Sequence, residues 1–214
     1  MSKKKILTVV GTRPEIIRLS SIIKKLDKCF EHHLVHTNQN FDYNLKDVFL
    51  KDFDLKPDYI FDMNSKNTIE NVSKILVKVD QLIKKIKPDA FLILGDTNSS
   101  LSAISAKKNK IPIFHIEAGN RCFNEIVPEE INRRIVDHIS DINLTYSDFA
   151  RNNLLNEGLK PDRIFKIGSP LYEVIKQNKN KIKINYYLKK NKLKKNQFFL
   201  LSFHREENIE NKKN

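Results

Sequence analysis

The sequence predicts an α/β fold built on a doubly wound parallel sheet. Apolar runs of about five residues alternate with amphipathic helical segments, the pattern of parallel strands covered on both faces. Four of the five glycines follow the carboxyl ends of predicted strands: Gly11, Gly95, Gly119 and Gly168. In open α/β sheets this edge binds ligands, although an ordinary turn would explain each glycine singly. The composition, 40% apolar and 30% charged, fits a globular chain with a real core.

The individual elements follow from the spacing of apolar residues. Short runs that stop at glycine predict buried strands, and apolar residues three or four apart predict helices. Pro14 and Pro128 mark first helical turns, and Asn67 or Thr68 caps the longest helix. The predicted strands are Ile6–Val10, His33–His36, Ala90–Leu94, Ile111–His115, Ile142–Thr145, Ile164–Ile167 and Phe198–Phe203. The predicted helices run from Pro14 to Leu26, from the cap at 67 or 68 to Ile86, and over Ser100–Lys108, Pro128–His138 and Phe149–Leu155.

The C-terminal part of the chain has a different character. We predict an N-terminal domain over 1–170, a Lys/Asn-rich connector over 171–196, and the first strand and loop of a truncated second domain over 197–214. The formal net charge is +13, and nine lysines without an acid between 176 and 195 supply most of it. A solvated, helix-rich surface segment is the simple interpretation of this run, and a patch for nucleic acid or anionic membrane is the alternative.

Several protein classes are excluded by simple patterns. No apolar run approaches the roughly 18 residues that a membrane span needs. The lysines at positions 3–5 are followed by only five apolar residues, too few for a signal peptide. Cys29 and Cys122 have no spacing typical of a zinc site or a disulfide framework. We therefore expect a cytoplasmic protein without a bound metal.

Three candidate site residues follow strands. Arg13 lies beside a helix N-terminus, and the arginine and the helix N-terminus both favour phosphate. The alternative is a surface arginine paired with Glu15. Asp96 directly follows the strand Ala90–Leu94, where it is either a functional carboxylate or a helix N-cap. Glu117 follows another buried strand, where an unpaired carboxylate is a candidate acid or base and a surface glutamate is the alternative.

Two further segments carry candidate residues. Glu129 with Arg133, and Glu130 with Arg134, are overlapping pairs four residues apart on one predicted helix. Surface salt bridges would explain both, but the pairs point about 100° apart, so one could face a cleft. His204 follows the last predicted strand and is a candidate phosphate ligand or an ordinary loop histidine. The chain has no GxGxxG dinucleotide fingerprint.

Together these segments resemble the non-hydrolysing UDP-N-acetylglucosamine 2-epimerase family. The matching segments, in the family's order and spacing, are Val10–Glu15, Gly95–Thr97, His115–Gly119, Pro128–Glu130 with Asn132 and Arg133, and His204–Asn208. Residues 118–123 and 133–138 look most like the capsule and O-antigen branch. That branch makes UDP-N-acetyl-L-fucosamine from the corresponding L-talose sugar nucleotide.

The resemblance implies a fold and a set of roles. The fold is the N-terminal, Rossmann-like half of a two-domain glycosyltransferase-B-type protein. The implied acid/base carboxylates are Asp96, Glu117 and Glu129, and the implied ligands of the sugar nucleotide are Arg13, Arg18, Arg133 and His204. Asn38 replaces a usual glycine, and Asn is among the residues that best tolerate a left-handed backbone. The uridine-binding residues of the second domain are absent from the chain.

The chemistry of such an enzyme suits these residue types. Breaking the C1–O bond to UDP creates an oxocarbenium-like centre, loss of the C2 proton gives a glycal, and return of the proton to the other face inverts C2. Carboxylates move the proton and cations hold the departing diphosphate, so no cofactor is required. A glycosyltransferase of the same fold and a non-catalytic basic binding protein are the alternatives.

The resemblance also sets expectations for partners and activity. The expected partner is a UDP-sugar, with no nucleic acid and no membrane, and the full-length protein is expected to be a homodimer. Catalysis in a cleft needs both walls. We therefore expect the 214-residue chain to fold its first domain without turning over substrate.

Overall fold

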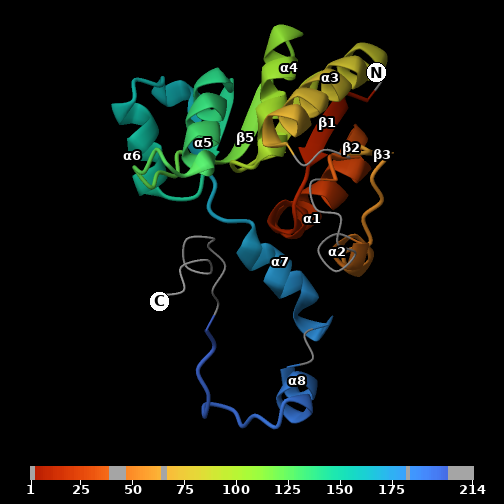
Figure 1. The fold of residues 1–214 in the computed structure, drawn as a ribbon, viewed down its shortest axis with the longest axis vertical. Coiled ribbons are helices and arrows are strands. Elements are labelled where there is room, and N and C mark those ends of the chain that lie inside the picture. The colour runs from red at the N-terminus through yellow and green to blue at the C-terminus, as the bar shows by residue number, and fades with distance from the viewer. Residues whose placement is uncertain (1–2, 39–46, 64–66, 182–183, 202–214) are drawn as a thin grey trace. The chain divides into compact units, whose positions relative to one another are not determined.

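A computed structural model describes residues 3–38, 47–63, 67–181 and 184–201 and confirms the α/β class (Figure 1). The chain divides into two compact units, Met1–Val174 and Ile175–Asn214, which we describe separately. None of the described helices is both long enough and apolar enough to cross a membrane.

The first unit is built on a seven-stranded sheet in the order β3-β2-β1-β4-β5-β6-β7, in which all neighbours are parallel. The strands are β1 (Lys5–Val10), β2 (Glu31–His36), β3 (Tyr59–Ile60), β4 (Ala90–Leu94), β5 (Ile113–Ala118), β6 (Ile142–Thr145) and β7 (Ile164–Lys166). The strand order reverses between β1 and β4, so the loops that follow these two strands diverge there. In folds of this kind such a switch point is where ligands bind.

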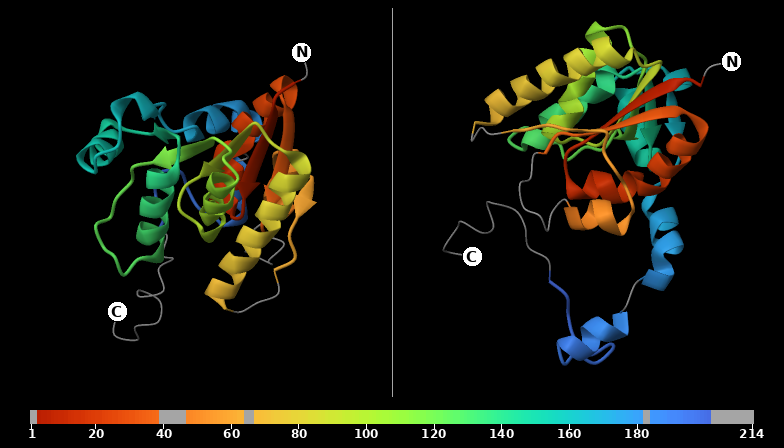
Figure 2. Two further views of the ribbon diagram at one scale, coloured as in Figure 1. Left: turned by 90° about the horizontal axis from the view of Figure 1, so that it is seen from above. Right: turned by 90° about the vertical axis from the view of Figure 1, so that its right-hand side faces the viewer.

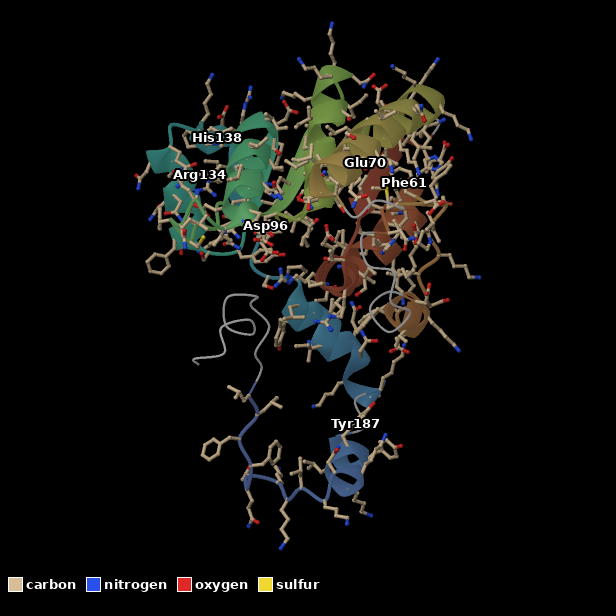
Figure 3. All side chains as sticks on the ribbon, viewed as in Figure 1. Phe61, Glu70, Asp96, Arg134, His138 and Tyr187 are labelled. Carbon is tan, nitrogen blue, oxygen red and sulfur yellow. The ribbon has the colours of Figure 1, made fainter. Side chains whose placement is uncertain are left out.

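Helices cover both faces of this sheet (Figure 2). They are α1 (Arg13–Cys29), α2 (Asp47–Asp52), α3 (Thr68–Ile86), α4 (Ala103–Lys108), α5 (Pro128–Ile139) and α6 (Asp148–Asn156), with short 3-10 turns η2 (Asn98–Ser102) and η3 (Pro161–Arg163). A further helix, α7 (Leu171–Asn178), begins in the first unit and ends in the second. The longest, α3, begins as predicted. Asn67 is its N-cap and accepts hydrogen bonds from the backbone N–H groups of Ile69 and Glu70; Figure 3 labels Glu70.

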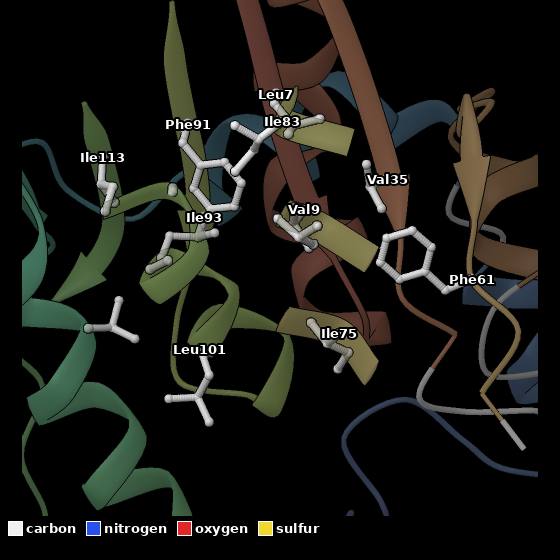
Figure 4. Close-up of a cluster of buried hydrophobic side chains, with 14 of the residues drawn as sticks. Leu7, Val9, Val35, Phe61, Ile75, Ile83, Phe91, Ile93, Leu101 and Ile113 are labelled. Carbon is white, nitrogen blue, oxygen red and sulfur yellow. The ribbon is translucent and has the colours of Figure 1, made fainter. Parts of the chain in front are cut away.

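Two apolar clusters lie on opposite faces of the sheet. The larger one joins the alternate strand residues Leu7, Val9, Phe91 and Ile93 to α3, α4 and α5 (Figure 4). The smaller one joins the intervening strand residues to α1 and α2. Because successive residues of a strand point to opposite faces, strands buried on both sides must be apolar at nearly every position. The apolar runs in the sequence identify six of the seven strands, and burial on both faces explains why the signal is strong in β1 and β4.

The structure corrects several predicted elements. The strand β3 and the helix α2 were not predicted, because two and six residues are too few to show a period. The predicted helix Ser100–Lys108 is divided into η2 and α4. The strand β5 ends at Ala118, three residues later than predicted, because a register shift between Ile116 and Ala118 lets pairing continue.

The second unit contains the end of α7, a 3-10 turn η4 (Lys179–Lys181) and the helix α8 (Ile184–Lys190). The lysines of the 176–195 run whose exposure is described are exposed, as predicted. The predicted strand Phe198–Phe203 is wrong over Phe198–Leu201, which has no regular structure, and its last two residues lie outside the described part. A strand needs neighbours to bond its backbone groups, and the described part of this unit contains none.

Candidate functional site

The predicted site residues that the structure describes come from elements that meet at one edge of the sheet. Arg13 and Arg18 lie on α1, which follows β1, whereas Asp96 follows β4 and Glu117 is the fifth residue of β5. Carboxyl ends of parallel strands share an edge, so Asp96 and Glu117 lie at the same edge. Glu129 lies at that edge too, in the first turn of α5. Figure 3 shows Asp96 near the end of α5 that is farther from His138.

Asp96 is held by the α5 side of the fold. Its Oδ2 accepts a hydrogen bond from Arg133 Nε at 2.9 Å and a second one from Arg133 Nη2. Its backbone carbonyl accepts from Asn132 Nδ2 at 2.9 Å. Helix capping does not explain Asp96, since Thr97 is the N-cap of η2 and its Oγ1 accepts from Ser99 N. Asp96 therefore presents a carboxyl group paired with an arginine.

The side chain of Glu117 is held by α1, on the face of the sheet opposite to α5. Regular alternation after Ile113 and His115 would turn its side chain toward α5, but the register shift and its left-handed φ of 71° turn it to α1. There Arg18 Nη1 donates to Glu117 Oε2. Burial raises the pKa of Glu117, the paired Arg18 opposes this, and the charge of Asp96 adds to it. A carboxyl with a raised pKa is suited to exchange protons near neutral pH.

The pairing predicted within α5 is partly wrong. Glu130 does pair with Arg134, at 3.2 Å, but Arg133 pairs with Asp96 and Glu130 and not with Glu129. The Glu130 side chain is 1% exposed and also accepts from Cys122 N at 3.0 Å. These donors hold the pKa of Glu130 at about 2, although burial alone would raise it. Glu129 is exposed in the first turn of α5, open to a ligand at this edge.

The pairing suggested for Arg13 is also wrong. Its guanidinium lies over the Phe49 ring, 5.8 Å from the centroid, and its side chain is exposed. Glu15 instead turns into the protein, where it is 2% exposed. Arg13 is therefore available at the start of α1, whose N-terminus favours anions. Asn38, predicted to tolerate a left-handed backbone, has a φ of 57°, whereas His204 lies outside the described residues.

Sequence reasoning missed the buried polar groups that support the site. Asp137 Oδ2 accepts from Arg121 Nη1 at 2.7 Å, and Arg121 also donates to Glu157 at 2.6 Å, although the Arg121 and Asp137 side chains are fully buried. His115 Nε2 lies 2.9 Å from the carbonyl oxygen of Gly95, the residue before Asp96. Tyr146 Oη is buried and has no hydrogen-bond partner among the described residues. A single sequence marks none of them, because polar residues are usually exposed.

Comparisons with known proteins identify the family of this chain. A family model described as UDP-N-acetylglucosamine 2-epimerase matches residues 24–214. A structure titled UDP-N-acetylglucosamine 2-epimerase from Rickettsia bellii is 50% identical, with a TM-score of 0.89, over 95% of this chain and 55% of that one.

Two more relatives show the range of named substrates. The Methanocaldococcus jannaschii UDP-N-acetylglucosamine 2-epimerase is 37% identical over 97% of this chain and 58% of its own length. Its crystal structure in complex with UDP-GlcNAc and UDP has a TM-score of 0.82 over 88% of this chain and 53% of that one. The Pseudomonas aeruginosa UDP-2,3-diacetamido-2,3-dideoxy-D-glucuronate 2-epimerase is 38% identical over 79% of this chain and 49% of its length. The chain thus spans only about half the length of the relatives it matches.

Proposed function

The chain belongs to the UDP-N-acetylglucosamine 2-epimerase family, and from this premise we propose that it is part of a sugar-nucleotide 2-epimerase. The proposed reaction inverts C2 of a UDP-N-acetylhexosamine by eliminating UDP and adding it back. The proposal rests chiefly on one observation: Asp96 and Glu117 lie at the same sheet edge, each paired with an arginine from a different helix layer.

This arrangement provides both halves of the chemistry. Glu117, whose pKa is raised by burial, and the exposed Glu129 are the proposed groups that remove the C2 proton from one face and return one to the other. Asp96 is the third proposed carboxylate and pairs with Arg133. Arg13, with Arg18 and Arg133, is proposed to neutralise the diphosphate as the C1–O bond breaks.

The substrate class follows from the relatives, whose names place UDP and a 2-acetamido sugar in the substrate. Within this class we propose the L-sugar branch, with UDP-N-acetyl-L-fucosamine for capsule or O-antigen as the product, because residues 118–123 and 133–138 resemble that branch. We further propose that residues 1–170 form one wall of the substrate cleft, and that the complete protein is a cytoplasmic homodimer whose His204 binds the diphosphate.

The deciding experiment is solvent exchange in deuterated water. The 214-residue chain is assayed alone and joined to the C-terminal region of the Rickettsia bellii relative, with UDP-GlcNAc and with the L-sugar nucleotide. The joined protein should place deuterium at C2, and the chain alone should not. Asp96→Asn and Glu117→Gln should each lower exchange by about a hundredfold or more, whereas the exposed Glu70→Gln should leave it unchanged.

Other outcomes would contradict the proposal. Transfer of the sugar to an acceptor without deuterium at C2 would indicate a glycosyltransferase. Full exchange in both carboxylate variants would remove Asp96 and Glu117 from the mechanism, and exchange by the chain alone would show that one wall suffices.

A further inference from the structure

The side chain of Glu15 forms hydrogen bonds with two separate loops, and only one of them leads into the helix that Glu15 caps. Its Oε2 accepts hydrogen bonds from Gly11 N at 3.0 Å, Thr12 N at 2.6 Å and Thr12 Oγ1 at 2.8 Å. Its Oε1 accepts from Thr97 Oγ1 at 3.1 Å. The bond to Thr12 N is that of an ordinary capping box at the start of α1. The bond to Thr97 reaches across to the loop after β4.

The connection continues to a third strand. Thr97 Oγ1 accepts from Ser99 N at 3.2 Å, and Ser99 Oγ lies 2.6 Å from Thr37 Oγ1, just beyond β2. Ser99 and Thr37 are fully buried. A chain of hydrogen bonds therefore links the loops after β1, β4 and β2. It crosses the point where the strand order reverses, at which the loops would otherwise be free to separate.

We propose that Glu15 is a positioning residue that clamps the β1–α1 loop to the β4–η2 loop and so sets the distance between the arginines of α1 and Asp96. Asp96 directly precedes the clamped Thr97, and Arg13 follows the clamped Thr12. The existence of the clamp is independent of the proposed function, and only its importance for catalysis rests on that function.

The cost of this arrangement supports a role beyond capping. Burial raises the pKa of Glu15 to about 7, although the donors of Thr12, Gly11 and Thr97 lower it. Burial is the largest influence on this pKa, and the hydrogen bonds that oppose it come from uncharged groups. A glutamate at the same helix position of α3, Glu70, is exposed and pairs with Lys74 at 2.6 Å. Capping alone is therefore achieved in this fold without a buried carboxylate.

The other charged or titratable groups around the clamp have their own contacts. On α1, Arg13 lies over Phe49 and Arg18 pairs with Glu117. Beyond β4, Asp96 pairs with Arg133. At the end of β2, His36 Nδ1 accepts from Asn38 N at 3.0 Å.

Amide hydrogen exchange of the 214-residue chain tests the clamp directly. In Glu15→Gln the exchange of backbone amides at 98–101, beyond β4, should rise about tenfold or more, the effect of losing one charge-assisted hydrogen bond. In Thr97→Val the same amides should respond while those of Gly11 and Thr12 stay protected. The matched control Glu70→Gln should affect only the start of α3.

A second measurement reports the carboxylate itself. The amide proton shifts of Gly11 and Thr12 should titrate with a midpoint of about 7. This midpoint should rise in Thr97→Val, since that variant removes a donor to the ionised form. A midpoint that persists in Glu15→Gln comes from another group and would contradict the assignment to Glu15.

Two results would overturn the proposal. One is unchanged exchange at 98–101 in Glu15→Gln, which would leave Glu15 as a cap alone. The other is a pH midpoint of the Gly11 and Thr12 amide proton shifts that is the same in Thr97→Val as in the wild type. If Glu15→Gln does not fold, the midpoint in Thr97→Val decides, because exchange at 98–101 in that variant also reflects the lost cap of Ser99 N. Neither measurement needs a nucleotide sugar, so absent epimerase activity would not be mistaken for an absent clamp.

Discussion

Replacing Gly11 with alanine should destabilise the first unit by crowding the hydroxyl pair beneath the β1–α1 loop. A Cβ at this position would overlap Ser99 Oγ and lie 2.5 Å from Thr37 Oγ1. Both hydroxyl side chains are fully buried, so they cannot turn toward solvent. Overpacking costs about 1–3 kcal/mol, and a broken buried hydroxyl pair adds about 1 kcal/mol. Gly11→Ala should therefore cost about 3 kcal/mol.

Urea unfolding followed by circular dichroism measures this cost, since the chain has no tryptophan. Ser99→Ala removes the overlapping hydroxyl and lets Thr37 rotate, so Gly11→Ala should cost about 1 kcal/mol less in that background. Gly168→Ala is the glycine control. Its Cβ meets nothing within 4 Å, and only the positive φ of 75° opposes it. Additive effects of Gly11→Ala and Ser99→Ala would refute the steric explanation.

Three further changes should have separate signatures. Because burial raises the pKa of Glu15 from 4.5 to about 7, the native state binds this proton more tightly than the unfolded chain. Between pH 4.5 and 7 the free energy of unfolding should therefore fall by about 3 kcal/mol more in the wild type than in Glu15→Gln. Parallel pH profiles of the two proteins, measured by urea unfolding, would contradict this. Phe91→Ala should cost about 3–5 kcal/mol in the same assay, because this side chain is fully buried in the larger cluster; a cost below about 1 kcal/mol would count against that packing. Asn67→Ala should cost about 1 kcal/mol and should speed amide exchange at Ile69 and Glu70, the two N–H groups that it caps; unchanged exchange there would show that the cap is not made.

The sequence allowed the sheet to be predicted because its strands are buried on both faces. Runs such as Ile6–Val10 and Ala90–Leu94 are barely interrupted by polar residues, because neither face of the strand meets solvent. The apolar pattern that predicts a strand is therefore strong in them. The two-residue β3 carries no such signal. Phe198–Leu201 has the apolar run that predicts a strand but forms none. An apolar run shows that a segment could pair, and it does not show that a neighbouring strand is present.

The candidate site was predictable in position but not in its contacts. Residues just past strands, such as Asp96, must lie at the carboxyl edge of a parallel sheet, so their place follows from the topology. Which cation each one meets depends on the helix layer that its side chain enters. For Glu117 that layer is decided by a register shift, and for Glu15 by a turn into the core, and neither leaves a trace in residue type.

Because of the register shift at Glu117, the direction of this side chain depends on the number of residues in the segment more than on their identity. Deleting the codon of Ala118 would restore alternation and send the Glu117 carboxylate to the α5 layer, away from Arg18. A conservative exchange of a neighbour such as Ile116 would leave the carboxylate where it is. Short insertions and deletions in this stretch should therefore be far more harmful than substitutions, although in a surface loop the reverse would hold.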